Sequence, residues 1–405
     1  MGYFPHTVRS LSWTGALRVT IRVITFFRIV LLARFLTPGQ FGVFGIASIV
    51  YSFLDTFSDI GLTIFFIQTT EPINIYLSTV WILSILRGVF MTICILVFAP
   101  VVISFFHNNN VYGILLFISL VPFIRGFINP SVLLFQKDLI FEKEYLYRSF
   151  LYFIDSLVVI SVAFLTRSAV SLVAGMVISA VFETLLSFFI VKPLPKFSTN
   201  IKKIKHILHA GKWITFSGIA TYFFQNGDDI VVGKLLSSSS LGLYQMAYKL
   251  ALLPNTEISN NAATVTFPVY TKIAHDLQRL KRAVLKTTGL VSLFSIIIAV
   301  ILYIFPNQII GIILGKQWEA AAPVLQILVI YGALRSISGS IIPAFLALKM
   351  QKTVAVINFV SLATLMIGVI PCILFYGLRG AGYAVLFSSI TAFITISFFT
   401  KKIFF

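Results

Sequence analysis

The chain is a series of long apolar stretches separated by short polar breaks. Four of the stretches carry no charged residue, at Gly88–Ile124, Thr287–Gly315, Thr353–Leu378 and Gly380–Thr400. Each is longer than the roughly 20 residues that cross a bilayer as a helix. The pattern therefore predicts an all-α membrane protein rather than a soluble domain.

Turn-forming residues divide the rest of the chain in the same way, and the whole pattern predicts about 12 transmembrane helices. The predicted spans are 12–36, 41–68, 76–105, 111–135, 146–166, 169–191, 212–235, 241–268, 285–305, 320–348, 353–376 and 381–400. Composition agrees, because 58% of residues are hydrophobic and only 11% are charged, against about a quarter charged in soluble domains.

The net charge of +18 gives the predicted helices an orientation. With both termini in the cytoplasm, the inner segments hold about four times as many Lys and Arg residues as the outer ones, as the positive-inside rule requires. The outer segments hold only Arg34, Arg167, Lys234, Lys316 and Arg379. The basic inner segments have few aromatic residues among them, so we assign them to topology and to contact with anionic lipids and exclude nucleic-acid binding.

A stretch near the N-terminus recurs in the second half of the chain. Arg28–Phe44 aligns with Asp228–Tyr244, so that Gly42 falls on Gly242, and further back Trp13 falls on Trp213. Six predicted spans per half is an even number, so the halves enter the membrane in the same direction. We expect two six-helix bundles related by a parallel pseudo-two-fold axis along the membrane normal.

The predicted domains are an N-terminal bundle at 1–195, a cytoplasmic amphipathic linker at 196–211 and a C-terminal bundle at 212–405. In the linker, Ile201, Ile204 and Leu208 share one helical face and lysines occupy the others, a pattern typical of a helix lying in the membrane interface.

Fourteen charged residues fall inside predicted spans, seven of each sign. The basic ones are Arg18, Arg22, Arg28, Arg87, Arg125, Lys249 and Arg335. The acidic ones are Asp55, Asp59, Asp155, Glu183, Asp228, Asp229 and Glu257. A charge at the bilayer centre costs at least about 2.5–3.5 kcal/mol on insertion scales, so this set predicts a polar interior.

The first hairpin places two basic and two acidic residues at matching depths. Arg18 and Asp59 are equidistant from the turn, as are Arg22 and Asp55, and at 1.5 Å per residue they lie about 25–30 Å from it, near the cytoplasmic face. Two interpretations stay open: salt bridges that pin the hairpin together, or an inner gate and entry site for an anionic head group.

Three further arginines, Arg28, Arg87 and Arg125, lie near mid-span and are candidates for an anion site. The planar guanidinium binds diphosphate oxygens through two parallel hydrogen bonds. Arg335 is the counterpart of Arg125 in the second half and joins the set. The alternative is that these arginines pair with Asp155 and Glu183.

The repeat places Asp228 where Arg28 stands in the first half, with Asp229 beside it. An internal bridge from Asp228 to Lys249, at the mirrored depth of the next span, is one interpretation. The other is a titratable or sodium-coordinating acid that couples transport to an ion gradient, with Glu257 as a second candidate. No Ser/His/Asp set and no metal-binding cluster is found in the sequence, and no bound cofactor is expected.

The chain resembles the bacterial polysaccharide flippases, the O-antigen and exopolysaccharide transporters of the multidrug/oligosaccharidyl-lipid/polysaccharide exporter superfamily. The residues that carry the resemblance are LLARFLTPGQFGVFGIASIV at Leu31–Val50, FSDIGL at Phe57–Leu62, LLFQKDLIFEKEY at Leu133–Tyr145, NGDDIVVGKLLSSSSLGLYQMAYKLALLP at Asn226–Pro254 and FPVYTKI at Phe267–Ile273.

The resemblance implies a V-shaped, monomeric, alternating-access transporter of the bacterial cytoplasmic membrane that is not an enzyme. Such a protein moves an undecaprenyl-diphosphate-linked oligosaccharide to the outer leaflet, is coupled to a proton or sodium gradient, and works beside polysaccharide polymerase machinery. The rival interpretations are a multidrug or other lipid exporter of the same superfamily, and a membrane glycosyltransferase or polymerase.

Overall fold

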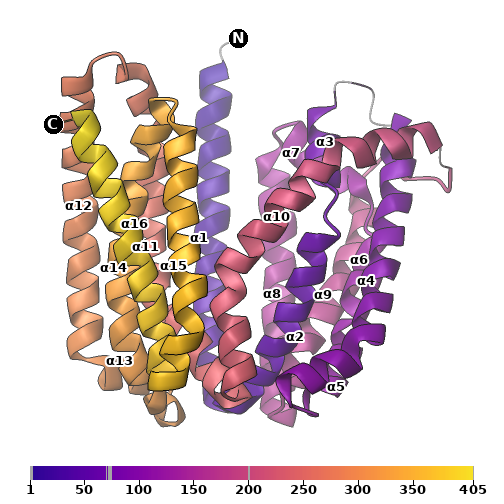
Figure 1. Ribbon diagram of the computed structural model, residues 1–405. Coiled ribbons are helices and arrows are strands. Elements are labelled where there is room, and N and C mark those ends of the chain that lie inside the picture. Colours follow the sequence, from indigo (N-terminus) through magenta and orange to yellow (C-terminus); the bar gives the residue numbers. More distant parts are fainter. Residues whose placement is uncertain (1–2, 70, 72–74, 199–200, 405) are drawn as a thin grey trace. The chain divides into compact units, whose positions relative to one another are not determined.

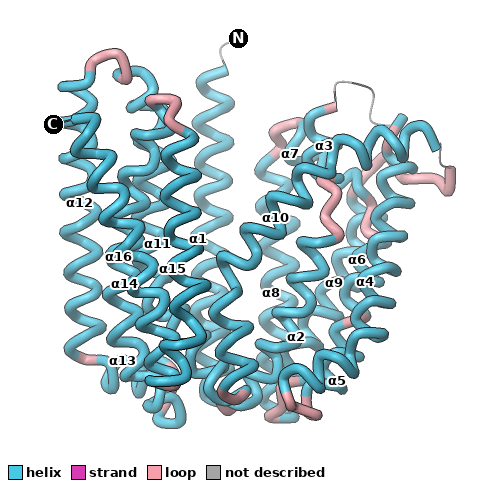
Figure 2. The backbone as a smooth tube through the Cα atoms, in the orientation of Figure 1, coloured by secondary structure: helices cyan, strands magenta, loops and turns pink. Residues whose placement is uncertain are grey.

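The computed structural model describes residues 3–69, 71, 75–198 and 201–404, although most side chains before residue 12 and between 201 and 220 lie outside that description. Every regular element in these ranges is helical (Figure 2). The chain forms two compact units, Met1–Asn226 and Gly227–Phe405.

Within the described residues, the first unit contains nine α-helices and the start of a long one, α10, that continues into the second (Figure 1). They are α1 (Tyr3–Phe35), α2 (Pro38–Phe57), α3 (Leu62–Gln68), α4 (Leu77–Phe106), α5 (Val111–Ile118), α6 (Leu120–Gly126), α7 (Leu134–Lys137), α8 (Phe141–Thr166), α9 (Val170–Ile190) and α10 (Ile201–Leu235). Helix α8 packs against both α1 and α9, while α4 packs against α5 and α6.

The second unit is built around one central helix. Its helices are α11 (Ser238–Ile273), α12 (Leu277–Ile304), α13 (Pro306–Ile313), α14 (Ala322–Ala347), α15 (Gln351–Tyr376) and α16 (Leu378–Phe404). Helix α14 packs against α11, α12 and α16 and is the most buried of the long apolar helices. Small residues such as Gly332, Ser336 and Ser340 let its neighbours approach closely.

Eight helices in the described ranges are long and apolar enough to cross a membrane, or nine if one bent pair counts as a span. The protein is therefore a multi-pass membrane protein. Helices α1, α10 and α11 are long enough but are not among the eight. These three carry Arg18, Arg22, Arg28, Asp228 and Lys249, among other charges, and such residues lower the apolarity of a helix.

Two predicted spans are broken rather than continuous. The predicted span 41–68 is interrupted between α2 and α3, where Gly61 adopts a left-handed φ of +67° that a side chain would resist. The predicted span 111–135 bends by 74° before Pro130, which begins a short 3-10 helix, Pro130–Leu133. Proline lacks the amide hydrogen that would continue the α-helical pattern.

The predicted linker at 196–211 overlaps the start of α10. From Ile201 onward the chain is helical and continuous with the predicted seventh span, so both belong to α10. Ile204 packs against a core cluster that includes Leu62 and Phe66 of α3. The side chains of Ile201, Leu208 and the lysines between them lie outside the described residues, and the three-part domain division stays a prediction.

The two hairpin turns share one capping arrangement. Helix α1 ends at Phe35 and α10 at Leu235. The next helices start after Thr37 and Ser237, whose hydroxyls accept hydrogen bonds from the amides three residues later at 3.4 and 3.1 Å. Each cap satisfies an amide that the first helical turn leaves unpaired. The two capping residues are therefore 200 positions apart, the same offset as in the sequence repeat.

Close glycine packing holds α4 against α6. A Cβ on Gly88 would overlap the Pro122 carbonyl oxygen, and one on Gly126 would lie 3.0 Å from the Ser84 carbonyl oxygen. Arg87 precedes Gly88, so this contact also fixes the depth of an arginine inside the bundle.

We expect Gly88→Ala to lower the thermal unfolding midpoint of the purified protein in detergent. Overpacking of this kind costs about 1–3 kcal/mol. Gly113→Ala in α5 is the matched control, because nothing lies within 4 Å of a Cβ at that position. Equal midpoints for both variants would show that the α4–α6 contact tolerates a methyl group.

Candidate functional site

Arg28 is bound by a carboxylate from another helix. Its Nη1 donates to Asp155 Oδ2 of α8, and the two side chains are only 19% and 11% exposed. The second oxygen, Asp155 Oδ1, is buried with no hydrogen-bond partner among the described residues. Gly175 of α9 makes room for it, since a Cβ there would lie 2.8 Å from Oδ1. Of the two interpretations of Arg28, pairing with Asp155 is the geometry present.

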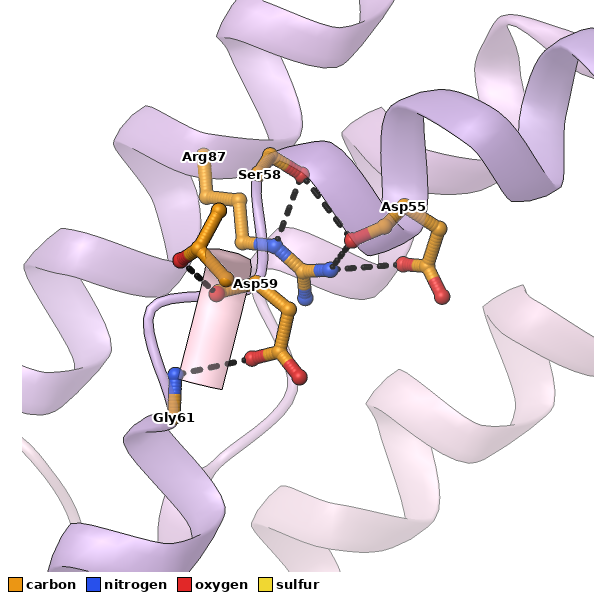
Figure 3. A network of polar contacts seen from close by, with 6 residues as sticks. Asp55, Ser58, Asp59, Gly61 and Arg87 are labelled. Carbon is orange, nitrogen blue, oxygen red and sulfur yellow. Dashed lines mark hydrogen bonds and ion pairs between the residues drawn. The ribbon is translucent and has the colours of Figure 1, made fainter. Parts of the chain in front are cut away.

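Arg87 stabilises the break between α2 and α3 (Figure 3). Its Nη2 donates to Asp55 Oδ1 at 2.7 Å and to the Asp55 carbonyl oxygen at 2.6 Å, and its Nε donates to Ser58 Oγ at 3.0 Å. One guanidinium thus satisfies a carboxylate, a hydroxyl and a main-chain carbonyl at the C-terminal end of α2. In a membrane such carbonyls need a protein partner.

Arg125 makes a looser ion pair. Its Nε lies 3.7 Å from Glu183 Oε2 of α9, and 42% of the Arg125 side chain is exposed. Tyr51 of α2 also interacts with the Arg125 guanidinium. All three mid-span arginines of the first unit therefore contact a carboxylate.

The four residues predicted as an inner gate have different surroundings. Arg18 and Arg22 are exposed along α1. The partner of Asp55 is Arg87, and Asp59 Oδ1 accepts a hydrogen bond from the Gly61 amide at 2.9 Å (Figure 3). The sequence argument compared positions within one hairpin. It could not identify Arg87 as the partner of Asp55, because Arg87 belongs to α4. Within the hairpin, Asp59 holds the helix break instead of a matched salt bridge.

In the second unit, Asp228 is 4% exposed and accepts a hydrogen bond from the Tyr244 hydroxyl at 2.6 Å. Asp229 accepts one from Gln245 Nε2 at 3.0 Å, and the charge of Lys249 acts on Asp229. Asp228 is thus held by a neutral phenol, where the sequence suggested a bridge to Lys249. The neighbouring positions 228 and 229 point to different sides of α10 because each helical residue turns about 100°.

Arg335 of α14 has aromatic partners. Its Nη1 donates to the Tyr331 hydroxyl at 2.5 Å and to the Tyr248 hydroxyl at 3.1 Å, and those two hydroxyl oxygens are 3.1 Å apart. Its guanidinium carbon also lies 5.8 Å from the centre of the Tyr331 ring. The remaining candidate, Glu257, lies half-buried in α11, three residues after Pro254.

Sequence reasoning missed the tyrosines. Tyr244 and Tyr248 are four residues apart on α11, and Tyr331 and Arg335 are four apart on α14, so each pair shares a helical face. This four-residue spacing could have identified the tyrosines from the sequence. Among the described residues, no group of three or more His, Cys, Asp or Glu side chains is placed to hold a metal ion.

The arrangement is better suited to binding an anion than to catalysing a reaction. It offers guanidinium groups, phenol hydroxyls and acids on helices of a multi-pass membrane protein. The predicted candidates fall into local groups: Arg28, Arg87 and Arg125 with their carboxylates in the first unit, and Asp228 and Arg335 with tyrosines in the second.

Known proteins resemble this chain along most of its length. The Lipopolysaccharide biosynthesis protein WzxC of Escherichia coli (strain K12) is 23% identical over 83% of this chain and 68% of its own. The Succinoglycan biosynthesis transport protein ExoT of Rhizobium meliloti (strain 1021) is 22% identical over 83% of this chain and 68% of its own.

The fold also has a solved counterpart. The structure titled Lipid II flippase MurJ, inward closed conformation, superposes with a TM-score of 0.78 at 19% identity, covering 96% of this chain and 87% of that one. At this identity the likeness concerns the fold alone.

A family model described as Polysaccharide biosynthesis protein matches residues 31–323. That match spans the chain from the end of α1 to the beginning of α14 and confirms the resemblance found in the sequence. The chain belongs to the polysaccharide biosynthesis protein family.

Proposed function

We propose that this protein is a flippase that moves an undecaprenyl-diphosphate-linked oligosaccharide repeat unit across the bacterial cytoplasmic membrane, for O-antigen, capsule or exopolysaccharide biosynthesis. The observation that carries the proposal is the family match over residues 31–323 in a multi-pass helical chain with arginines within its helices. The names of WzxC and ExoT support polysaccharide synthesis, and that of ExoT supports transport.

The transport cycle we infer is alternating access by two six-helix bundles in a V-shaped arrangement, related by a parallel two-fold axis. The equivalent caps at Thr37 and Ser237 support the duplication. So does a local likeness between the units: Arg125 of α6 interacts with Tyr51 of α2, and Arg335 of α14 with Tyr248 of α11.

Arg28, Arg87, Arg125 and Arg335 are the proposed binding residues for the diphosphate and sugars. In the first unit a diphosphate has to replace a carboxylate partner. In such an exchange the guanidinium passes from one anionic partner to another, so it is not left unpaired within the membrane. Arg18, Arg22, Asp55 and Asp59 remain the proposed inner gate.

Asp228 and Asp229, with Lys249 and Glu257, are the proposed coupling residues for a proton or sodium gradient. A buried carboxylate held by one phenol changes its charge or its partner more readily than one locked to a guanidinium. The protein is proposed to act as a monomer with both termini in the cytoplasm, next to polysaccharide polymerase machinery, and as a translocase rather than an enzyme.

A multidrug exporter of the same fold would need an acid-dominated pocket for cations. In the first unit, Asp55, Asp155 and Glu183 each contact an arginine instead. A glycosyltransferase or polymerase would need acids or arginines on long loops, whereas these are on helices. Both alternatives are therefore weaker.

Deletion of the gene should abolish display of the surface polysaccharide and accumulate one lipid-linked glycan on the inner leaflet. Extraction of that lipid and analysis of its sugars identifies the substrate. Accumulation of the lipid-linked glycan in the outer leaflet, with its synthesis unchanged, would instead place the protein after translocation.

Arg28→Ala should lower the amount of folded protein in the membrane, because removing one member of a buried pair costs about 3–5 kcal/mol. Arg28→Ala combined with Asp155→Ala should restore the amount, since no buried charge is left over. If Arg28 also binds substrate, the double variant reaches normal levels and still fails to display polysaccharide. Normal display in the double variant would reduce Arg28 to a structural role.

Transport of lipid-linked oligosaccharide into vesicles should depend on an imposed proton or sodium gradient and should weaken in Asp228→Asn. Asp138→Asn, an exposed position between α7 and α8, serves as the control. Transport that depends on neither gradient would contradict the coupling role of Asp228. It would not contradict the proposed flippase function.

A further inference from the structure

The partners of Arg335 differ in kind from those of the other three candidate arginines. Arg28, Arg87 and Arg125 each contact a carboxylate. Within the described residues, Arg335 contacts only the hydroxyls of Tyr248 and Tyr331 and the face of the Tyr331 ring. A neutral phenol accepts a hydrogen bond and does not cancel a charge. Arg335 therefore keeps a positive charge that no contacting acid neutralises.

The donors of this group can be counted. Both hydrogen bonds of Arg335 come from Nη1, so the edge formed by Nε and Nη2 makes no hydrogen bond to the described residues. That edge is the one whose parallel N–H groups match two oxygens of a phosphate or carboxylate. One of the two phenols donates to the other across 3.1 Å, and the proton of the second phenol remains available. The group therefore has N–H and O–H donors to spare, and no anionic acceptor among the described residues binds them.

The packing of α11 on α14 fixes this geometry before any ligand binds. Gly332, next to Tyr331, lies so close to α11 that a Cβ there would be 2.9 Å from the Ala251 carbonyl oxygen. The Tyr248 and Tyr331 rings are 5.8 Å apart and tilted by 45°. Preorganised donors of this kind bind an anion without first losing side-chain freedom.

The nearest acid along the hydrogen-bonded chain does not reach Arg335. Asp228 is hydrogen-bonded to Tyr244, whose ring lies 5.9 Å from the Tyr248 ring at a tilt of 48°. The Arg335 charge acts on Asp228 through space, but Asp228 makes no ion pair with Arg335 among the described residues. Arg335 and Tyr248 are both half-buried, which leaves an approach for a ligand. The other arginines have to exchange a carboxylate for the ligand, and Arg335 does not.

We propose that Arg335, Tyr248 and Tyr331 form the subsite of this transporter that binds the diphosphate of the lipid-linked substrate, with the two tyrosines as positioning residues that hold the Arg335 fork edge-on to the phosphate oxygens. The proposal rests on the proposed function. It adds that this subsite can bind the anion without first displacing a carboxylate.

The test measures binding of undecaprenyl diphosphate and undecaprenyl monophosphate to the full-length purified protein by native mass spectrometry, with phosphatidylglycerol present at a fixed fraction. We expect the wild type to prefer the diphosphate. Arg335→Lys, which keeps the charge and loses the fork, and Tyr331→Phe should each weaken diphosphate binding about tenfold, the effect of losing one hydrogen bond to a charged group. Tyr248→Phe is the second tyrosine variant, should Tyr331→Phe fail to fold.

Arg379→Lys and Tyr376→Phe are matched controls, exposed positions of the same unit that should bind like the wild type. A merely structural role would lower the thermal midpoint without changing the preference for diphosphate over monophosphate. Two results overturn the proposal: unchanged preference in Arg335→Lys and in a folded tyrosine variant, or a wild type that binds the diphosphate no better than phosphatidylglycerol. Either would leave the proposed function standing, because gene deletion tests that function separately.

Discussion

The structure depends on one constraint, the cost of a charge or an unpaired backbone group in the hydrocarbon core. Arg28, Arg87 and Arg125 meet it with carboxylates from other helices of the same unit. Because each pair joins two helices, the charges also decide which helices must be neighbours. Arg87 meets both parts of the constraint, since the same guanidinium pairs with Asp55 and covers the open end of α2.

The two units meet the constraint differently. The first uses ion pairs, which are strong and selective for one partner. The second surrounds Asp228 and Arg335 with phenols, which can donate or accept and carry no charge at neutral pH. A phenol can stay in contact with Asp228 when a cation binds there, or with Arg335 when an anion binds there. The charged groups of the first unit thus have fixed partners, whereas those of the second unit have adaptable ones.

Much of the fold could be predicted from the sequence, because a membrane helix is a property of local apolarity. The hairpin turns, the long helices and the family resemblance are of this kind. The breaks at Gly61 and Pro130 were harder to place, since apolar residues continue on both sides of each and few polar residues, Asp59 and Asn129 among them, mark the turn. The ion-pair partner of each arginine was the hardest feature to predict. Asp155 and Glu183 were named as alternatives for the arginines, whereas Arg87–Asp55 needed knowledge of which helix lies beside α2.

The Arg28–Asp155 pair has a consequence for biogenesis. The partners are 127 positions apart, so at about 5–20 residues per second a ribosome takes about 6–25 s to make Asp155 after Arg28. During that interval α1 carries Arg18, Arg22 and Arg28 with α8 not yet made. We expect α1 to wait at the insertion machinery or the lipid surface until the later helices arrive. Helix α1, although made well before α8, would then settle only after α8 arrives.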